Sequence, residues 1–126
     1  MGLRTPIARV RGLGASRGGL EHWWAQRLSA VALVPLAVWF VASLAAHAGD
    51  GHSAVVAWMA RPWVAALNVM FIAALFYHAQ LGVQIVIEDY VPGDFARLAS
   101  LICLKFFSAL LAIASILAVV RVAAGG

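Results

Sequence analysis

The residues most able to do chemistry lie in one segment near the middle of the chain. His78 sits deep in an apolar run that ends, eleven residues later, at Asp89 and Tyr90. An α-helix turns about 100° per residue, so eleven residues return nearly to the starting direction over a rise of about 16 Å. We therefore expect an imidazole at membrane depth and a carboxylate with a phenol near the membrane surface, all on one helix.

These residues must be positioned by helices that lie in a lipid bilayer. Of 126 residues, 64% are hydrophobic and 11% are charged, whereas soluble domains carry about 25% charged residues. Three apolar stretches are long enough for a bilayer core of about 30 Å, which takes about 20 helical residues. We predict an all-α membrane protein with transmembrane helices at 24–47, 62–88 and 96–121. These form one anchor domain (22–126), preceded by an extended basic arm over residues 1–21.

The distribution of basic residues predicts the orientation in the membrane. Five of the nine precede the apolar part of the first span: Arg4, Arg9, Arg11, Arg17 and Arg27. The positive-inside rule then places the N-terminus in the cytoplasm, and three crossings place the C-terminus outside, in the periplasm of a bacterium. A basic arm also suits nucleic acid, but topology and anionic lipid explain it. We expect membrane lipid and no nucleic acid as its partner.

Proline and glycine residues indicate where the spans bend, begin and end. Pro35 falls inside the first span and should kink it unless neighbours satisfy the freed carbonyl. Residues 53–61 form a candidate interfacial helix, and Pro62 suits the first turn of the second span. Pro92-Gly93 separates the second span from the third. Lys105, inside the third span, is best explained as a lysine that reaches the interface along its own side chain.

Two interpretations of His78 remain open at this stage. It can be a histidine hydrogen-bonded to a neighbouring helix, or an axial ligand of haem, since imidazole is a common axial ligand. Ala74 and Gly82 lie one turn on either side of it. Small residues there leave room for a flat macrocycle, and they equally allow close helix packing. No other histidine lies mid-span, so a second histidine ligand must come from another chain.

The other polar residues also have two interpretations each. Arg27 is either a cytoplasmic anchor of the first span or a partner for an anionic cofactor group such as a haem propionate. Asp89 and Tyr90 are either an exposed helix end or part of a site in which a phenol protonates a quinone carbonyl. Interhelical hydrogen bonding is the simpler interpretation of the remaining polar residues of the second span: Asn68, Gln80 and Gln84.

The pattern His78-x-x-x-Gly82-x-Gln84-x-x-x-Glu-Asp89-Tyr90 resembles the signature of the small membrane-anchor subunit of succinate dehydrogenase. The N-terminal run Arg4-Thr-Pro-Ile-Ala-Arg-Val-Arg-Gly-Leu-Gly looks like the alphaproteobacterial form. So does the run from His22 to Ala30. Together with length and the three spans, the resemblance covers most of the chain.

The resemblance implies an electron-transfer complex in which two membrane subunits hold haem b and form a quinone site against an iron–sulfur subunit, which a flavoprotein subunit supplies with electrons. It implies that His78 is the axial ligand and that Gly82 makes room beside it. The haem pocket would include Arg27 and His22. Tyr90 would hydrogen-bond the quinone, and Asp89 would hold an arginine of the companion subunit.

The sequence therefore favours a subunit of succinate:quinone oxidoreductase that performs no succinate chemistry and has no complete active site of its own. The resemblance implies that the companion membrane anchor is a cytochrome b subunit, and the expected location is the bacterial inner membrane. Two alternatives stay open: an anchor of a quinol:fumarate reductase, and a transporter or assembly subunit in which His78 only packs. The sequence leaves open the quinone type, the direction of the reaction, the haem potential and the second haem ligand.

Overall fold

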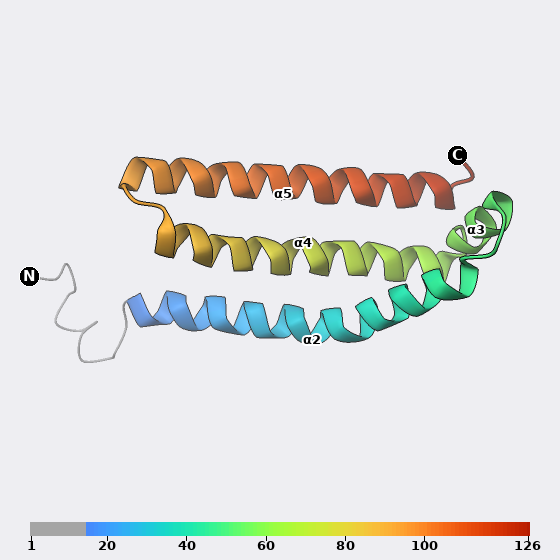
Figure 1. Cartoon of the computed structure of the whole chain (residues 1–126), viewed down its shortest axis with the longest axis horizontal. Coiled ribbons are helices and arrows are strands. Elements are labelled where there is room, and N and C mark those ends of the chain that lie inside the picture. Colours follow the sequence, from blue (N-terminus) through green and yellow to red (C-terminus); the bar gives the residue numbers. More distant parts are fainter. Residues whose placement is uncertain (1–14) are drawn as a thin grey trace, which may run out of the picture.

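The computed structural model describes residues 15–126, and side chains from residue 19 onward. Three long helices lie side by side: α2 (Ala15–His47), α4 (Pro62–Tyr90) and α5 (Asp94–Ala123). A short helix, α3 (His52–Met59), connects α2 to α4 at one end. Figure 1 shows α4 between α2 and α5, and α4 contacts both of them. The all-α prediction with three long apolar helices is confirmed.

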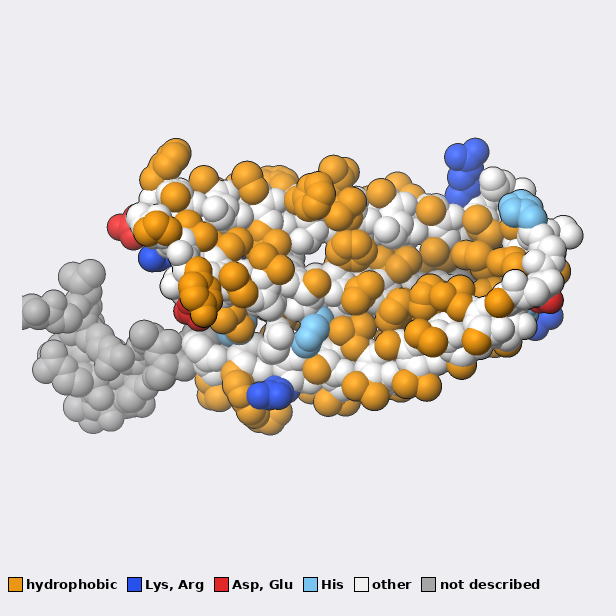
Figure 2. Space-filling view, in the orientation of Figure 1, with side chains coloured by type: hydrophobic (Ala, Val, Ile, Leu, Met, Phe, Trp, Pro, Cys, Tyr) orange, Lys and Arg blue, Asp and Glu red, His pale blue; other side chains and the backbone are white. Residues whose placement is uncertain are grey.

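Each long helix is long and apolar enough to cross a membrane. The 29 residues of α4 rise about 43 Å at 1.5 Å per residue, more than the bilayer core of about 30 Å. In the most apolar window of each helix, 6–11% of the residues are buried inside the chain. Hydrophobic side chains cover the middle of the face in Figure 2, and most charged side chains lie toward its ends. This surface suits lipid or other membrane subunits as neighbours.

The first helix begins earlier than predicted. The part of the basic arm at residues 1–14 lies outside the described residues, but α2 already begins at Ala15, so residues 15–21 are helical and not extended. The helix contains Pro35 without ending there, and its path curves in Figure 1. A proline inside a helix removes one hydrogen bond and commonly produces such a bend.

Local sequence explains the remaining boundaries. Pro62 opens α4, where its missing N–H is not needed. A short helix is present close to the range predicted at 53–61, as α3 (His52–Met59). Between α4 and α5 the chain turns through Gly93, whose φ of +83° favours a residue without a side chain. This turn brings the start of α5 beside the end of α4 that carries Asp89 and Tyr90 (Figure 1).

At the opposite end, an aromatic cluster joins α2 to α3. The ring of Trp58, which is buried, lies 6.2 Å from that of Trp39 and 4.5 Å from that of His47. His47 also contacts Asp50 through Nδ1 at 2.6 Å. His47 therefore connects the end of α2 to α3.

Candidate haem and quinone sites

His78 lies at the interface of α2 and α4 and contacts one polar residue there. Its Nδ1 is 2.8 Å from Oγ of Ser29, which is buried with 7% of its surface exposed. The same Oγ donates to the carbonyl oxygen of Gln26 at 3.0 Å. The structure gives Nε2 of His78 no hydrogen-bond partner among residues 19–126. One ring nitrogen is therefore held by α2 and the other remains available to a ligand.

Gly82 faces the same helix one turn away. Among the described residues, a Cβ atom built on it would meet a single neighbour within 4 Å, the Nε2 atom of Gln26 at 3.9 Å. That distance is ordinary van der Waals contact, so α2 does not approach closely enough to require a glycine. The packing of α2 on α4 thus does not explain, within the described part of the chain, why position 82 has no side chain.

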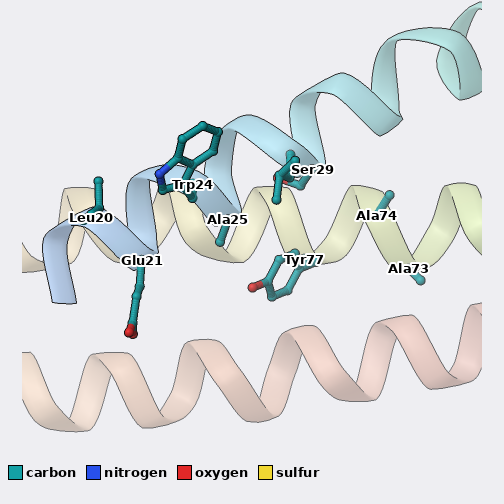
Figure 3. Close-up of a pocket in the computed structure, with 9 residues that line it drawn as sticks. Leu20, Glu21, Trp24, Ala25, Ser29, Ala73, Ala74 and Tyr77 are labelled. Atoms are coloured by element: carbon teal, nitrogen blue, oxygen red, sulfur yellow. The ribbon is translucent and has the colours of Figure 1, made fainter. Parts of the chain in front are cut away.

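A groove of about 900 Å³ lies between α2 and α4 beside Ser29. Figure 3 shows that its lining comes from both helices, with small side chains on each. The small lining residues are Ala25 and Ser29 of α2 and Ala73 and Ala74 of α4, and the larger ones are Leu20, Glu21, Trp24, Leu28 and Tyr77. Its volume is within the range of ligand-binding sites, about 300–1,000 Å³. His78 does not itself line the groove. Two of the lining residues are close to His78, because Ser29 contacts it and Ala74 lies one turn from it on α4.

A smaller, polar hollow lies between α2 and α4 near the N-terminal end of α2. It has a volume of about 290 Å³ and is lined by Gly19, His22, Gln84 and Glu88. Gln84 donates a hydrogen bond to Glu88 at 2.9 Å, and both residues belong to α4. The sequence had predicted a hydrogen bond from Gln84 to another helix. Nε2 of His22, which lines this hollow, and Oε1 of Gln26, one turn further along α2, are buried without a hydrogen-bond partner among the described residues.

Arg27 points away from these residues. It is two positions from Ser29, which is about 200° around a helix. The side chain is exposed, and its guanidinium lies over the ring of Trp23, 5.4 Å from the centroid. Within this chain the structure does not bring Arg27 to His78, so a role beside an anionic group would involve a neighbouring subunit.

Asp89 and Tyr90 form the exposed end of α4. Tyr90 is 79% exposed, and neither side chain has an ion-pair or hydrogen-bond partner in the described part of the chain. Arg97 of α5 bonds the carbonyl oxygen of Val91 at 3.4 Å and lies 3.6 Å from Asp94. It thereby holds the turn that follows Tyr90. Asp89 and Tyr90 are thus separated from His78 along α4, as the spacing predicted, and they face outward.

The sequence singled out His78 but not its partners. Ser29, Gln26 and Glu88 were missed as site residues because the sequence does not show the register of α2 on α4. That register brings Ser29 to His78 and Gln26 to Gly82, and it places Glu88 in one hollow with His22. Within residues 19–126 no group of three or more His, Cys, Asp or Glu side chains could hold a metal ion. A single axial imidazole does not depend on such a group.

The fold and site define a multi-pass membrane protein with three spans, whose single mid-span imidazole lies at a helix interface. Residues 1–121 match the family model described as the succinate dehydrogenase/fumarate reductase transmembrane subunit. The chain belongs to this family. No solved structure gives a significant match.

Curated relatives agree with this assignment. The succinate dehydrogenase hydrophobic membrane anchor subunit of Rickettsia bellii is 31% identical over 116 residues, covering 92% of this chain and 93% of the relative. The subunit of the same name from Paracoccus denitrificans is 31% identical over 121 residues, covering 96% and 93%. A succinate dehydrogenase membrane anchor subunit from Reclinomonas americana is 28% identical over 93 residues, covering 71% and 78%. The predicted family resemblance is confirmed.

Proposed function

We propose that this chain is the membrane-anchor subunit of a succinate:quinone oxidoreductase, and that it holds haem b through His78 and contributes Tyr90 and Asp89 to the quinone-reduction site. The observation that carries the haem proposal is the pair of ring nitrogens of His78: Nδ1 is hydrogen-bonded to Ser29 and Nε2 has no partner in the described chain. Ligating histidines commonly have this arrangement, with the second nitrogen bonded to a protein oxygen.

The neighbouring residues fit such a group. Gly82 leaves space that the packing of α2 does not use, and four small residues line the groove beside Ser29 together with larger ones. The buried Nε2 of His22 and Oε1 of Gln26 lack partners in this part of the chain. Buried polar atoms are rarely left without a hydrogen bond, so a ligand or companion subunit is expected to supply one. Haem bound here would accept and return single electrons.

The chain's own contribution to quinone chemistry lies at the end of α4. Reduction of a quinone to a quinol takes two electrons and two protons, and it places negative charge on a carbonyl oxygen. The phenol of Tyr90 can donate a hydrogen bond to that oxygen, which stabilises the developing charge. Asp89 would act through a cation of the companion subunit. Both side chains are exposed and unpaired in the described chain, as expected for residues that other subunits cover.

The proposed orientation places this end of the molecule in the cytoplasm of a bacterium, together with the N-terminal end of α2 (Figure 1). Arginine residues precede the first span, which favours this side by the positive-inside rule. The iron–sulfur and flavoprotein subunits would then dock on the cytoplasmic face, and the C-terminus would lie in the periplasm.

A quinol:fumarate reductase would use the same parts in the opposite direction, and the family description includes both enzymes. The relatives described above are named for succinate dehydrogenase, which favours quinone reduction.

Affinity purification of the tagged chain from native membranes tests the proposal. We expect a flavoprotein, an iron–sulfur protein, a second membrane subunit and a b-type haem spectrum. A chain that purifies with other partners and without haem would contradict it.

A further inference from the structure

Ser29 makes two contacts at once through a single hydroxyl group. Its Oγ lies 3.0 Å from the carbonyl oxygen of Gln26, three residues earlier in α2, and 2.8 Å from Nδ1 of His78 in α4. The residue is buried, with 7% of its surface exposed. Both contacts are therefore made inside the helix interface and not in bulk solvent.

Counting hydrogens assigns the tautomer of the imidazole. A hydroxyl has one hydrogen to donate, and a carbonyl oxygen can only accept. If Ser29 donates its hydrogen to Gln26, the contact with His78 needs a hydrogen from Nδ1. In the opposite tautomer, Ser29 would have to donate to Nδ1 and would lose its bond to Gln26. Only the Nδ1–H tautomer satisfies both contacts, and it leaves the lone pair on Nε2.

From this geometry, and resting on the proposed function, we infer that Ser29 is a positioning residue for haem ligation. By accepting the Nδ1 hydrogen of His78, it fixes the orientation of the ring and presents Nε2 to the iron. Such a hydrogen bond also makes the imidazole a stronger electron donor, which stabilises ferric relative to ferrous iron. Loss of a comparable partner typically weakens metal binding by about 10- to 100-fold.

The test compares three variants in the purified complex, with redox titration of the haem as the readout. Ser29→Ala removes the acceptor, so we expect a more positive haem midpoint potential and lower haem content. Ser29→Thr retains a hydroxyl that can bond the preceding turn in the same way, so it should restore the wild-type potential. Ser108→Ala makes the same change at a buried serine of α5 and serves as the control.

If Ser29→Ala prevents assembly, Ser29→Cys takes its place, because a thiol has nearly the same shape but is a weak acceptor. It should shift the potential in the same direction. A wild-type potential in the assembled Ala or Cys variant, with haem still lost in His78→Ala, would overturn the role of Ser29 and leave the proposed ligand intact. Unchanged haem in His78→Ala would instead refute the proposed ligand, and the role of Ser29 with it.

Discussion

Replacing Gly82 distinguishes clearance for a cofactor from close helix packing. In the part of the chain that the structure describes, a methyl group at this position would meet only Nε2 of Gln26, at 3.9 Å, which is an ordinary contact with the end of a flexible side chain. Alanine also favours a helix over glycine by about 0.8–1 kcal/mol. Gly82→Ala should therefore leave the helix pair intact. A phenylalanine extends several ångströms further, into the space that haem would occupy beside His78.

Overpacking of this kind typically costs about 1–3 kcal/mol. If the cost falls on haem binding, it corresponds to a loss of roughly 5- to 150-fold in affinity, since about 1.4 kcal/mol is tenfold. The assay is the ratio of haem to protein in the purified complex. Val83→Phe is the matched control, because it places the same phenylalanine on the same turn, at a side chain that is 45% exposed.

We expect low haem content in Gly82→Phe and normal content in Val83→Phe. Full haem content in an assembled Gly82→Phe complex would place the cofactor on another face of α4. Equal losses in both variants would indicate that bulk anywhere on this turn prevents assembly, and the argument from Gly82 would then fail.

Two further predictions concern the two ends of the molecule. Tyr90→Phe and Asp89→Asn should each slow succinate-to-quinone electron transfer. Both variants should largely retain succinate oxidation with an artificial acceptor that draws electrons from the soluble subunits. Equal loss in both assays would indicate failed assembly, and no loss in either would place the quinone site elsewhere. Trp58→Ala should lower the stability of the fold by roughly 3 kcal/mol or more, as the loss of a buried tryptophan typically does, and should lower the temperature at which the complex dissociates. Trp63→Ala, at a side chain 55% exposed, should change that temperature little. Similar shifts in both variants would contradict the structural role of the aromatic cluster.

Hydropathy and turn residues were sufficient to predict most of the fold. The expected spans at 62–88 and 96–121 correspond to α4 and α5 within a few residues. Their ends are determined by local chemistry, by Pro62 at one boundary and by the Pro92-Gly93 turn at the other. The start of α2 was predicted too late, because glycines and arginines before residue 21 show no apolar period, and yet residues 15–21 continue the helix.

The candidate site was less predictable because it depends on how two helices are aligned. The sequence shows that a histidine lies in the middle of an apolar span, but the contact of His78 with Ser29 joins positions 49 residues apart. Nothing in the spacing of either helix specifies which turn of α2 faces which turn of α4. For the same reason Arg27 looked like a neighbour of the site, although its direction on α2 takes it to Trp23.

The assignment of His78 as the haem ligand is tested most directly by the reduced-minus-oxidised spectrum of the purified complex carrying His78→Ala. His52→Ala, at an exposed histidine that opens α3, is the matched control. We predict that the b-type haem signal is lost or clearly altered in His78→Ala and unchanged in His52→Ala, with all subunits still present. An unaltered low-spin haem spectrum in the assembled His78→Ala complex would contradict the assignment.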